Sequence, residues 1–157
     1  MALRKIRTQE DPVLQKISKP VVSFDAKLSI LLGDMKDTLA KADGVGLAAV
    51  QIGILRRVVV IDVGDEHGYM ELINPEIIDR KGEQLEAEGC LSLPHKSGKT
   101  LRPMWVKFKA QDRKGNWFEA EGEGLFARCV CHELDHLDGV VFTQRLAPGE
   151  TVSYVRD

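Results

Sequence analysis

Two stretches of the chain carry apolar residues at helical spacing. In residues 24–43 the apolar side chains recur every three or four positions, which predicts an amphipathic helix. They are Leu28, Leu31, Leu32, Met35 and Leu39. Ser23 or Asp25 would cap the start of this helix, and Gly44 would end it. A second helix is predicted from about Gly124 to Leu137, with its end at Gly139.

Shorter stretches have the patterns of strands. The segment RRVVVIDV (56–63) is β-branched and continuous, and residues 70–79 and 83–94 are typical of further extended segments. From Trp105 to Ala120 apolar residues alternate with charged ones around a turn at 112–115, which indicates a hairpin. The expected fold is α+β, with short, mostly antiparallel strands packed around the C-terminal-half helix and a second helix in the N-terminal half.

Composition places the chain among ordinary globular proteins. It has 157 residues, 43% of them apolar and 29% charged, with a net charge of −2 and no repeat or linker. A single domain over residues 1–157 is therefore expected. Interleaved charges give no signal for nucleic acid or membrane binding. No run approaches the roughly 20 apolar residues of a membrane span, and no signal peptide is evident, so a soluble, cytoplasmic protein is expected.

A helical wheel at about 100° per residue turns the polar residues of the second helix inward. His132 and His136 fall on one apolar line with Leu125 and Cys129, and Glu133 falls on the adjoining line. Burying a carboxylate without a partner costs several kcal/mol. Two imidazoles four residues apart converge on one point, where a divalent cation would engage both and offset the glutamate charge. This is the H-E-x-x-H pattern of metallohydrolases.

The opposite side of that wheel is expected to face solvent. It collects Arg128, Cys131, Leu134, Asp135 and Asp138. Cys131 is interpreted as an uninvolved thiol. Asp135 is either a solvated acid or a partner that orients a metal ligand.

A third ligand has to come from another segment. His67 and His95 lie in polar segments and are interpreted as solvated loop residues. Cys90 ends an extended segment beside Gly89, where backbone can approach closely. It is either a small buried hydrophobe or the third member of a Cys/His/His set that leaves a fourth position for water, as catalytic zinc sites do.

Two further sequence features limit the interpretation. Three cysteines, Cys90, Cys129 and Cys131, make an odd count that does not suggest a disulfide framework, and Cys129 is expected to be a buried thiol. The glycine-rich segment DGVGLAAVQIG (43–53) has neither the G-x-x-x-x-G-K nor the G-x-G-x-x-G pattern of phosphate-binding loops. It is either a helix stop followed by a tight loop, or backbone that approaches a substrate, with Gln51 as an amide donor.

Three motifs in order resemble those of the peptide deformylase family. They are GVGLAAVQ at Gly44–Gln51, EGCLS at Glu88–Ser92 and HELDH at His132–His136, and the resemblance extends over nearly the whole chain. The resemblance implies the following roles: metal ligands Cys90, His132 and His136; catalytic acid/base Glu133; oxyanion donors Gln51 and the N–H of Leu91; substrate-lining residues Val45 and Gly46. The family often has glutamine where this chain has Cys131.

The resemblance also implies an activity. Peptide deformylases remove the N-formyl group from the starting methionine of new polypeptides, by attack of a metal-bound water with the glutamate as general acid/base. One divalent ion per chain is implied, Fe²⁺ in the family, although zinc, nickel or cobalt also suits the ligands. The expected partners are nascent N-formyl-Met peptides near the ribosome, and a monomer is expected. Two alternatives remain at this point, a metallopeptidase with the same H-E-x-x-H chemistry and a metal-stabilised binding module.

Overall fold

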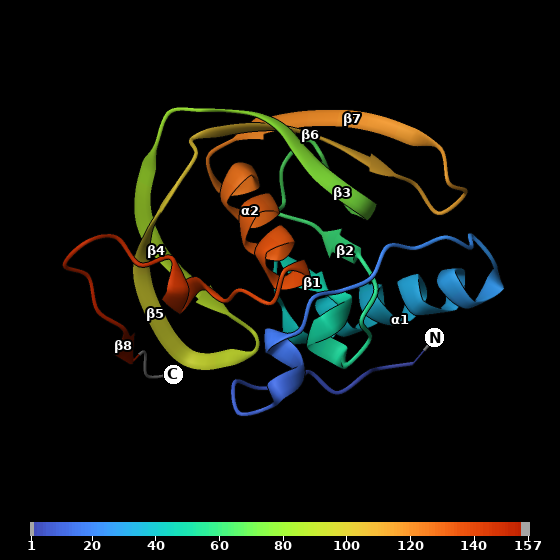
Figure 1. Cartoon of the computed structure of the whole chain (residues 1–157), viewed down its shortest axis with the longest axis horizontal. Coiled ribbons are helices and arrows are strands. Elements are labelled where there is room, and N and C mark those ends of the chain that lie inside the picture. Colours follow the sequence, from blue (N-terminus) through green and yellow to red (C-terminus); the bar gives the residue numbers. More distant parts are fainter. Residues whose placement is uncertain (1, 155–157) are drawn as a thin grey trace.

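A five-stranded antiparallel sheet forms the centre of the molecule, and a three-stranded sheet lies beside it (Figure 1). The structure is a computed structural model, and it describes residues 2–154. In spatial order the larger sheet contains β1 (Gly46–Ala48), β2 (Val58–Ile61), β3 (Met70–Lys81), β6 (Trp105–Gln111) and β7 (Trp117–Glu123). The smaller sheet contains β4 (Gln84–Cys90), β5 (Leu93–Arg102) and β8 (Ser153–Tyr154). These elements and two α-helices confirm the expected α+β class.

The first helix, α1, spans Ala26–Ala42, close to its predicted limits. Of the two predicted caps it is Asp25 that acts, since its carboxylate accepts the N–H of Leu28 at 3.1 Å. Asp43 ends the helix in the left-handed region (φ 55°), and the N–H of Gly44 then donates to the carbonyl of Leu39. The chain therefore leaves α1 directly into β1.

The larger sheet is covered on both faces. Along β2, Val58 and Val60 pack with the residues of α1, whereas Val59 and Ile61 pack with those of α2 (Leu125–Leu137). All four side chains are buried, which explains why this strand has a continuous apolar sequence without alternation. In Figure 1, α2 runs through the centre of the molecule between the two sheets. Side chains on either face of α2 are therefore enclosed.

Two predicted segments differ from the structure. Residues 83–94 do not form one strand, because the chain turns at Leu91 and Ser92 and returns as β5 in a β4–β5 hairpin. The glycine-rich segment is not only a loop, since it contains β1 and a 3₁₀ helix at Ala49–Ile52. The predicted hairpin is confirmed as β6 and β7, with the N–H of Gly115 donating to the carbonyl of Asp112 across the turn.

Two other short 3₁₀ helices, Pro12–Gln15 and Phe142–Gln144, lie in the connecting segments. Within residues 2–154, no helix is long and apolar enough to cross a membrane.

Candidate active site

Helix α2 directs three polar side chains into the interior. His132 is 7% exposed, Glu133 3% and His136 0%, as the helical wheel predicts. Cys90, at the end of β4, meets the two histidines from the facing hairpin. Its Sγ lies 3.2 Å from Nε2 of His136, and that nitrogen lies 3.2 Å from Nε2 of His132. The structure thus brings together, within 4.8 Å of one another, the three groups expected to bind a metal.

The electrostatics around these three groups favour a bound cation. Burial pushes the pKa of His132 down, but the charge of Glu133 and hydrogen bonds with Cys90 and Glu88 raise it well above its usual value. Burial and the neighbouring His132 hold the pKa of His136 well below its usual value, so this ring is neutral and offers a lone pair. Excess negative charge that holds a proton at this point would also hold a divalent cation. A thiolate and two imidazole nitrogens are donors that transition metals accept.

Glu133 is buried beside this cluster without a hydrogen-bond partner for one of its oxygens. Among residues 2–154, no group donates to its Oε1. Burial raises the pKa of Glu133 to about 7, against the opposing attraction of His132. A carboxyl group with a pKa near neutrality can both accept and return a proton at physiological pH. Such an unsatisfied oxygen facing a cavity is the arrangement expected of a proton carrier.

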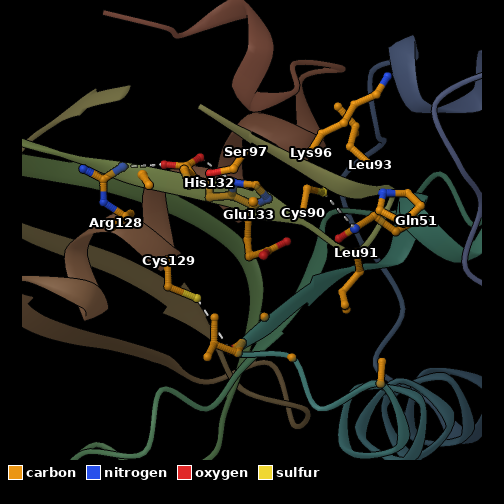
Figure 2. Close-up of a pocket in the computed structure, with 18 of the residues that line it drawn as sticks. Gln51, Cys90, Leu91, Leu93, Lys96, Ser97, Arg128, Cys129, His132 and Glu133 are labelled. Carbon is orange, nitrogen blue, oxygen red and sulfur yellow. Dashed lines mark hydrogen bonds and ion pairs between the residues drawn. The ribbon is translucent and has the colours of Figure 1, made fainter. Parts of the chain in front are cut away.

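Gln51 presents its side-chain amide to the same cluster. The N–H of Ala48 donates to its Oε1 at 2.9 Å, which fixes the orientation of the amide group. Its Nε2 then donates to Oγ of Ser92 at 3.0 Å and to Sγ of Cys90 at 3.6 Å. Figure 2 shows Gln51 on the side of Cys90 away from Glu133, with Leu91 nearby. The amide of Gln51 and the carboxylate of Glu133 therefore lie on different sides of Cys90.

A cavity of about 780 Å³ opens onto these groups (Figure 2). Three of the residues that line it are Gly46, the first residue of β1, Val45, directly before that strand, and Leu91, in the turn after β4. Val45 is largely exposed, and its carbonyl accepts the N–H of Asp62 and the thiol of Cys129. Every residue that the sequence assigned to the chemistry, apart from His136, lines this cavity. His136 lies behind them, fully buried.

Glu88 is a functional residue that the sequence reasoning did not single out. Its Oε2 accepts the Nδ1–H of His132 at 2.6 Å. The other ring nitrogen of His132, Nε2, is therefore directed at Cys90 and His136. Burial alone would raise the pKa of Glu88, but hydrogen bonds from His132 and Arg102 hold it well below its usual range. The available signal was its place in β4, two residues before Cys90, because alternate residues of a strand share a face.

Two arginines support Glu88 in turn. Arg102 donates to both of its oxygens, at 3.1 and 2.6 Å, and Arg128 donates to Oε1 at 2.7 Å. Arg102 also donates to Asp135 at 2.7 Å. Of the two interpretations of Asp135, the structure therefore favours the second, because the acid is linked to His132 through Arg102 and Glu88.

Several expectations about exposure are wrong. Most of the back of α2 does not face solvent, since Arg128 is 5% exposed and Cys131 6%. Asp138, directly after the helix, is exposed as expected. Burial raises the pKa of Cys131 to about 11, so the thiol stays protonated. His67 is not a solvated loop residue, since its ring stacks on Phe126 at 3.7 Å. His95 is exposed as expected, although it lies in β5 and lines the outer part of the cavity.

The fold and the site together define a class of enzyme, a hydrolase with H-E-x-x-H on a central helix and a cysteine from a facing hairpin. Comparisons with known proteins narrow the class. The family model described as polypeptide deformylase matches residues 3–152.

Similar relatives and solved structures bear the same description. A peptide deformylase of Caldicellulosiruptor bescii is 56% identical over 93% of this chain and 87% of its own length. One from Alkaliphilus metalliredigens is 53% identical over 93% of this chain and 98% of its own. The crystal structure of peptide deformylase from Thermotoga maritima aligns with a TM-score of 0.90 at 42% identity, covering 94% of this chain and 100% of that one. The chain therefore belongs to the polypeptide deformylase family, metallohydrolases that remove N-formyl groups from new polypeptides.

Proposed function

We propose that residues 1–157 form one catalytic domain that hydrolyses the formamide bond of N-formyl-Met peptides. Glu133, Cys90, His132 and His136 form its reaction centre, and Gln51 and Leu91 assist. The observation that carries this proposal is the convergence, at an open cavity, of a half-buried thiol, two buried imidazoles and a carboxylate with one unpartnered oxygen. A structural metal site would have four protein ligands, and among residues 2–154 the ligand group at this position has three.

Cys90, His132 and His136 would hold one divalent cation per chain, which we propose to be Fe²⁺, as in the family. When bound, a cation at this site would supply a Lewis acid that makes water more acidic and withdraws electrons from the formyl oxygen. The thiolate makes the site suitable for zinc, nickel or cobalt as well, so these metals should also be found in purified preparations.

The substrate would enter along the cavity with its backbone beside Val45 and Gly46. Gly46 has no side chain, which lets its backbone lie directly against Glu133. A peptide that hydrogen-bonds with this backbone would therefore lie beside that carboxylate. The amide of Gln51, fixed by Ala48, and the N–H of Leu91 would donate to the formyl oxygen as it gains negative charge. One such donor is worth about 3–4 kcal/mol in a protease precedent.

Glu133 would carry the proton in both halves of the reaction. With its pKa near 7, it accepts a proton from the attacking water and then delivers it to the nitrogen of the leaving amine. The products are formate and a peptide with a free amino terminus. Burial of the carboxylate next to the cavity keeps bulk water from competing for that proton.

The substrates would be nascent N-formyl-Met peptides, met in the cytoplasm near the ribosome by a monomeric enzyme. The cavity suits such a substrate, because it is open at one end and lined by backbone and apolar groups near the reaction centre. A peptide terminus can therefore enter while the rest of the chain stays outside.

The decisive experiment combines metal analysis of anaerobically purified protein with a formyl-Met-Ala-Ser assay. We expect one iron per chain and release of formate, with no cleavage of internal peptide bonds in blocked peptides. Exposure to air and peroxide should abolish activity, because ferrous iron and its thiolate ligand both oxidise. Cleavage of blocked peptides instead would identify a metallopeptidase.

Two variants separate metal binding from chemistry. Glu133→Ala should retain the metal and lose about 10²–10⁴-fold in kcat, the usual contribution of a general acid/base. Cys90→Ser should lose metal affinity, measured as metal content after dialysis. Unchanged turnover in the first variant would remove Glu133 from the mechanism, and unchanged metal content in the second would point to another third ligand.

A further inference from the structure

The cavity is lined by two segments of different character. On one side lie residues 42–46, where α1 ends and β1 begins, and on the other lie residues 87–97 of the β4–β5 hairpin. The reaction centre occupies the inner end. An extended peptide that runs outward from that centre would present successive side chains to opposite sides, because side chains alternate along an extended chain.

Lys96 carries a positive charge on the hairpin side of this cavity. Lys96 lies next to Gly89 of β4, the strand that ends in Cys90. The carbonyl oxygen of Lys96 is 3.4 Å from the position of a Cβ built on Gly89. Figure 2 shows its side chain beyond Leu93, on the same hairpin as Cys90. The ammonium donates to Oε1 of Gln9 at 2.5 Å and lies 5.9 Å from the ring centre of Tyr154.

The charge of Lys96 has no carboxylate partner among residues 2–154, since Gln9 is neutral and the contact with Tyr154 is to its ring. Arg128 also lines the cavity, but it is buried and pairs with Glu88. On the α1 side, the exposed charge is that of Asp43, the first residue of the glycine-rich segment. The outer part of the cavity therefore has a basic side and an acidic side.

We propose that Lys96 determines sequence preference: it favours peptides with an acidic side chain within the few residues that follow the formylated methionine. The inference rests on the proposed function, because it assigns a substrate preference to the same cavity. The contacts with Gln9 and Tyr154 restrain the ammonium, which lowers the entropy that it loses when a carboxylate binds. Because Asp43 faces the cavity from the other segment, an acidic residue is favoured at one position and not at its immediate neighbour.

The test is a positional scan of formyl-Met tetrapeptides with glutamate, glutamine or lysine at residues 2, 3 and 4. At one position kcat/KM should follow the order Glu, Gln, Lys, with roughly twofold to fivefold between Glu and Gln, the range of a solvent-exposed ion pair. The difference should appear in KM, because the charge acts far from the reacting bond. It should also shrink when the salt concentration is raised from 50 to 500 mM.

Lys96→Met removes the charge with little change of shape and should abolish this order while leaving the glutamine peptides unaffected. Lys99→Met is the matched control, since Lys99 is exposed on the same strand but does not line the cavity, and it should keep the order. A flat scan, or an order that persists in Lys96→Met, overturns the inference while deformylation of the neutral peptides stands.

A parallel measurement does not depend on turnover. In NMR titrations, the unformylated products should bind with the same Glu over Gln preference, and Lys96→Met should remove it. If no formylated peptide is cleaved, the proposed function fails, and these titrations still decide the role of Lys96.

Discussion

Among single residues, Gly46 best illustrates how tightly the backbone approaches the reaction centre. A Cβ at this position would lie 2.7 Å from Oε2 of Glu133 and 2.9 Å from Sγ of Cys129, closer than real Cβ contacts. We expect Gly46→Ala to displace the carboxylate by a fraction of an ångström to about 1 Å and to lower kcat by up to about 10²-fold.

The measurement for Gly46→Ala pairs steady-state kinetics with a thermal melt. The melting temperature should fall far less than activity, because the Glu133 side chain can move while the core stays packed. A variant with wild-type kcat would show that the carboxylate position is not critical.

Sequence alone predicted the inward direction of His132, Glu133 and His136, because helical periodicity fixes direction relative to neighbours on the same helix. It could not predict which other segment covers a residue. For that reason Cys131 was expected to face solvent, and His67 was expected to be solvated although its ring packs on Phe126 of α2. Contacts between segments distant in the chain leave no periodic trace.

Among the elements, α2 differs from an ordinary amphipathic helix because both its faces are buried. Its front face carries the reaction centre, and its back face carries the ion pairs of Arg128 and Asp135 with the β4–β5 hairpin. These pairs explain how charged residues remain in a central helix without exposure to solvent. They also connect the far side of the helix to the orientation of His132.

Asp135→Asn tests that connection. Loss of the carboxylate frees Arg102, which loosens Glu88 and hence the ring of His132. We expect about tenfold weaker Co²⁺ affinity, at the low end of what partners of metal ligands contribute, measured by absorbance titration of metal-free protein.

Asp138→Asn is the control for that experiment. Asp138 follows the same helix, but its side chain is 60% exposed and pairs with Arg57. This variant should bind Co²⁺ as the wild type does. Equal affinities in the two variants would mean that the link through Arg102 does not orient the metal ligand.

For the whole molecule, the α+β class and both α-helices were predictable, whereas the strand order and the separate strand β5 were not. The larger sheet places β6 beside β3, so the β4–β5 hairpin leaves the sheet and returns across α2. Only this excursion brings Cys90 to the histidines. Cys90 became a ligand candidate from its residue type and the glycine beside it, and its meeting with α2 depends on packing across more than 40 residues.

The same packing makes stability depend on Glu133. Its folded pKa, about 7, lies above the ordinary value of 4.5, so between these values the folded chain binds more protons than the unfolded chain. The contribution of Glu133 to the free energy of unfolding of metal-free protein therefore falls as pH rises through this range. Glu133→Gln removes the buried charge, although His132 then loses an attractive partner. We expect this variant to be about 1–2 kcal/mol more stable at pH 8 in urea denaturation, with the difference vanishing below pH 4.5, where the carboxyl is protonated in both states. A difference that is constant with pH would mean that the Glu133 carboxyl has the same pKa in the folded and the unfolded chain, and that its charge does not destabilise the fold.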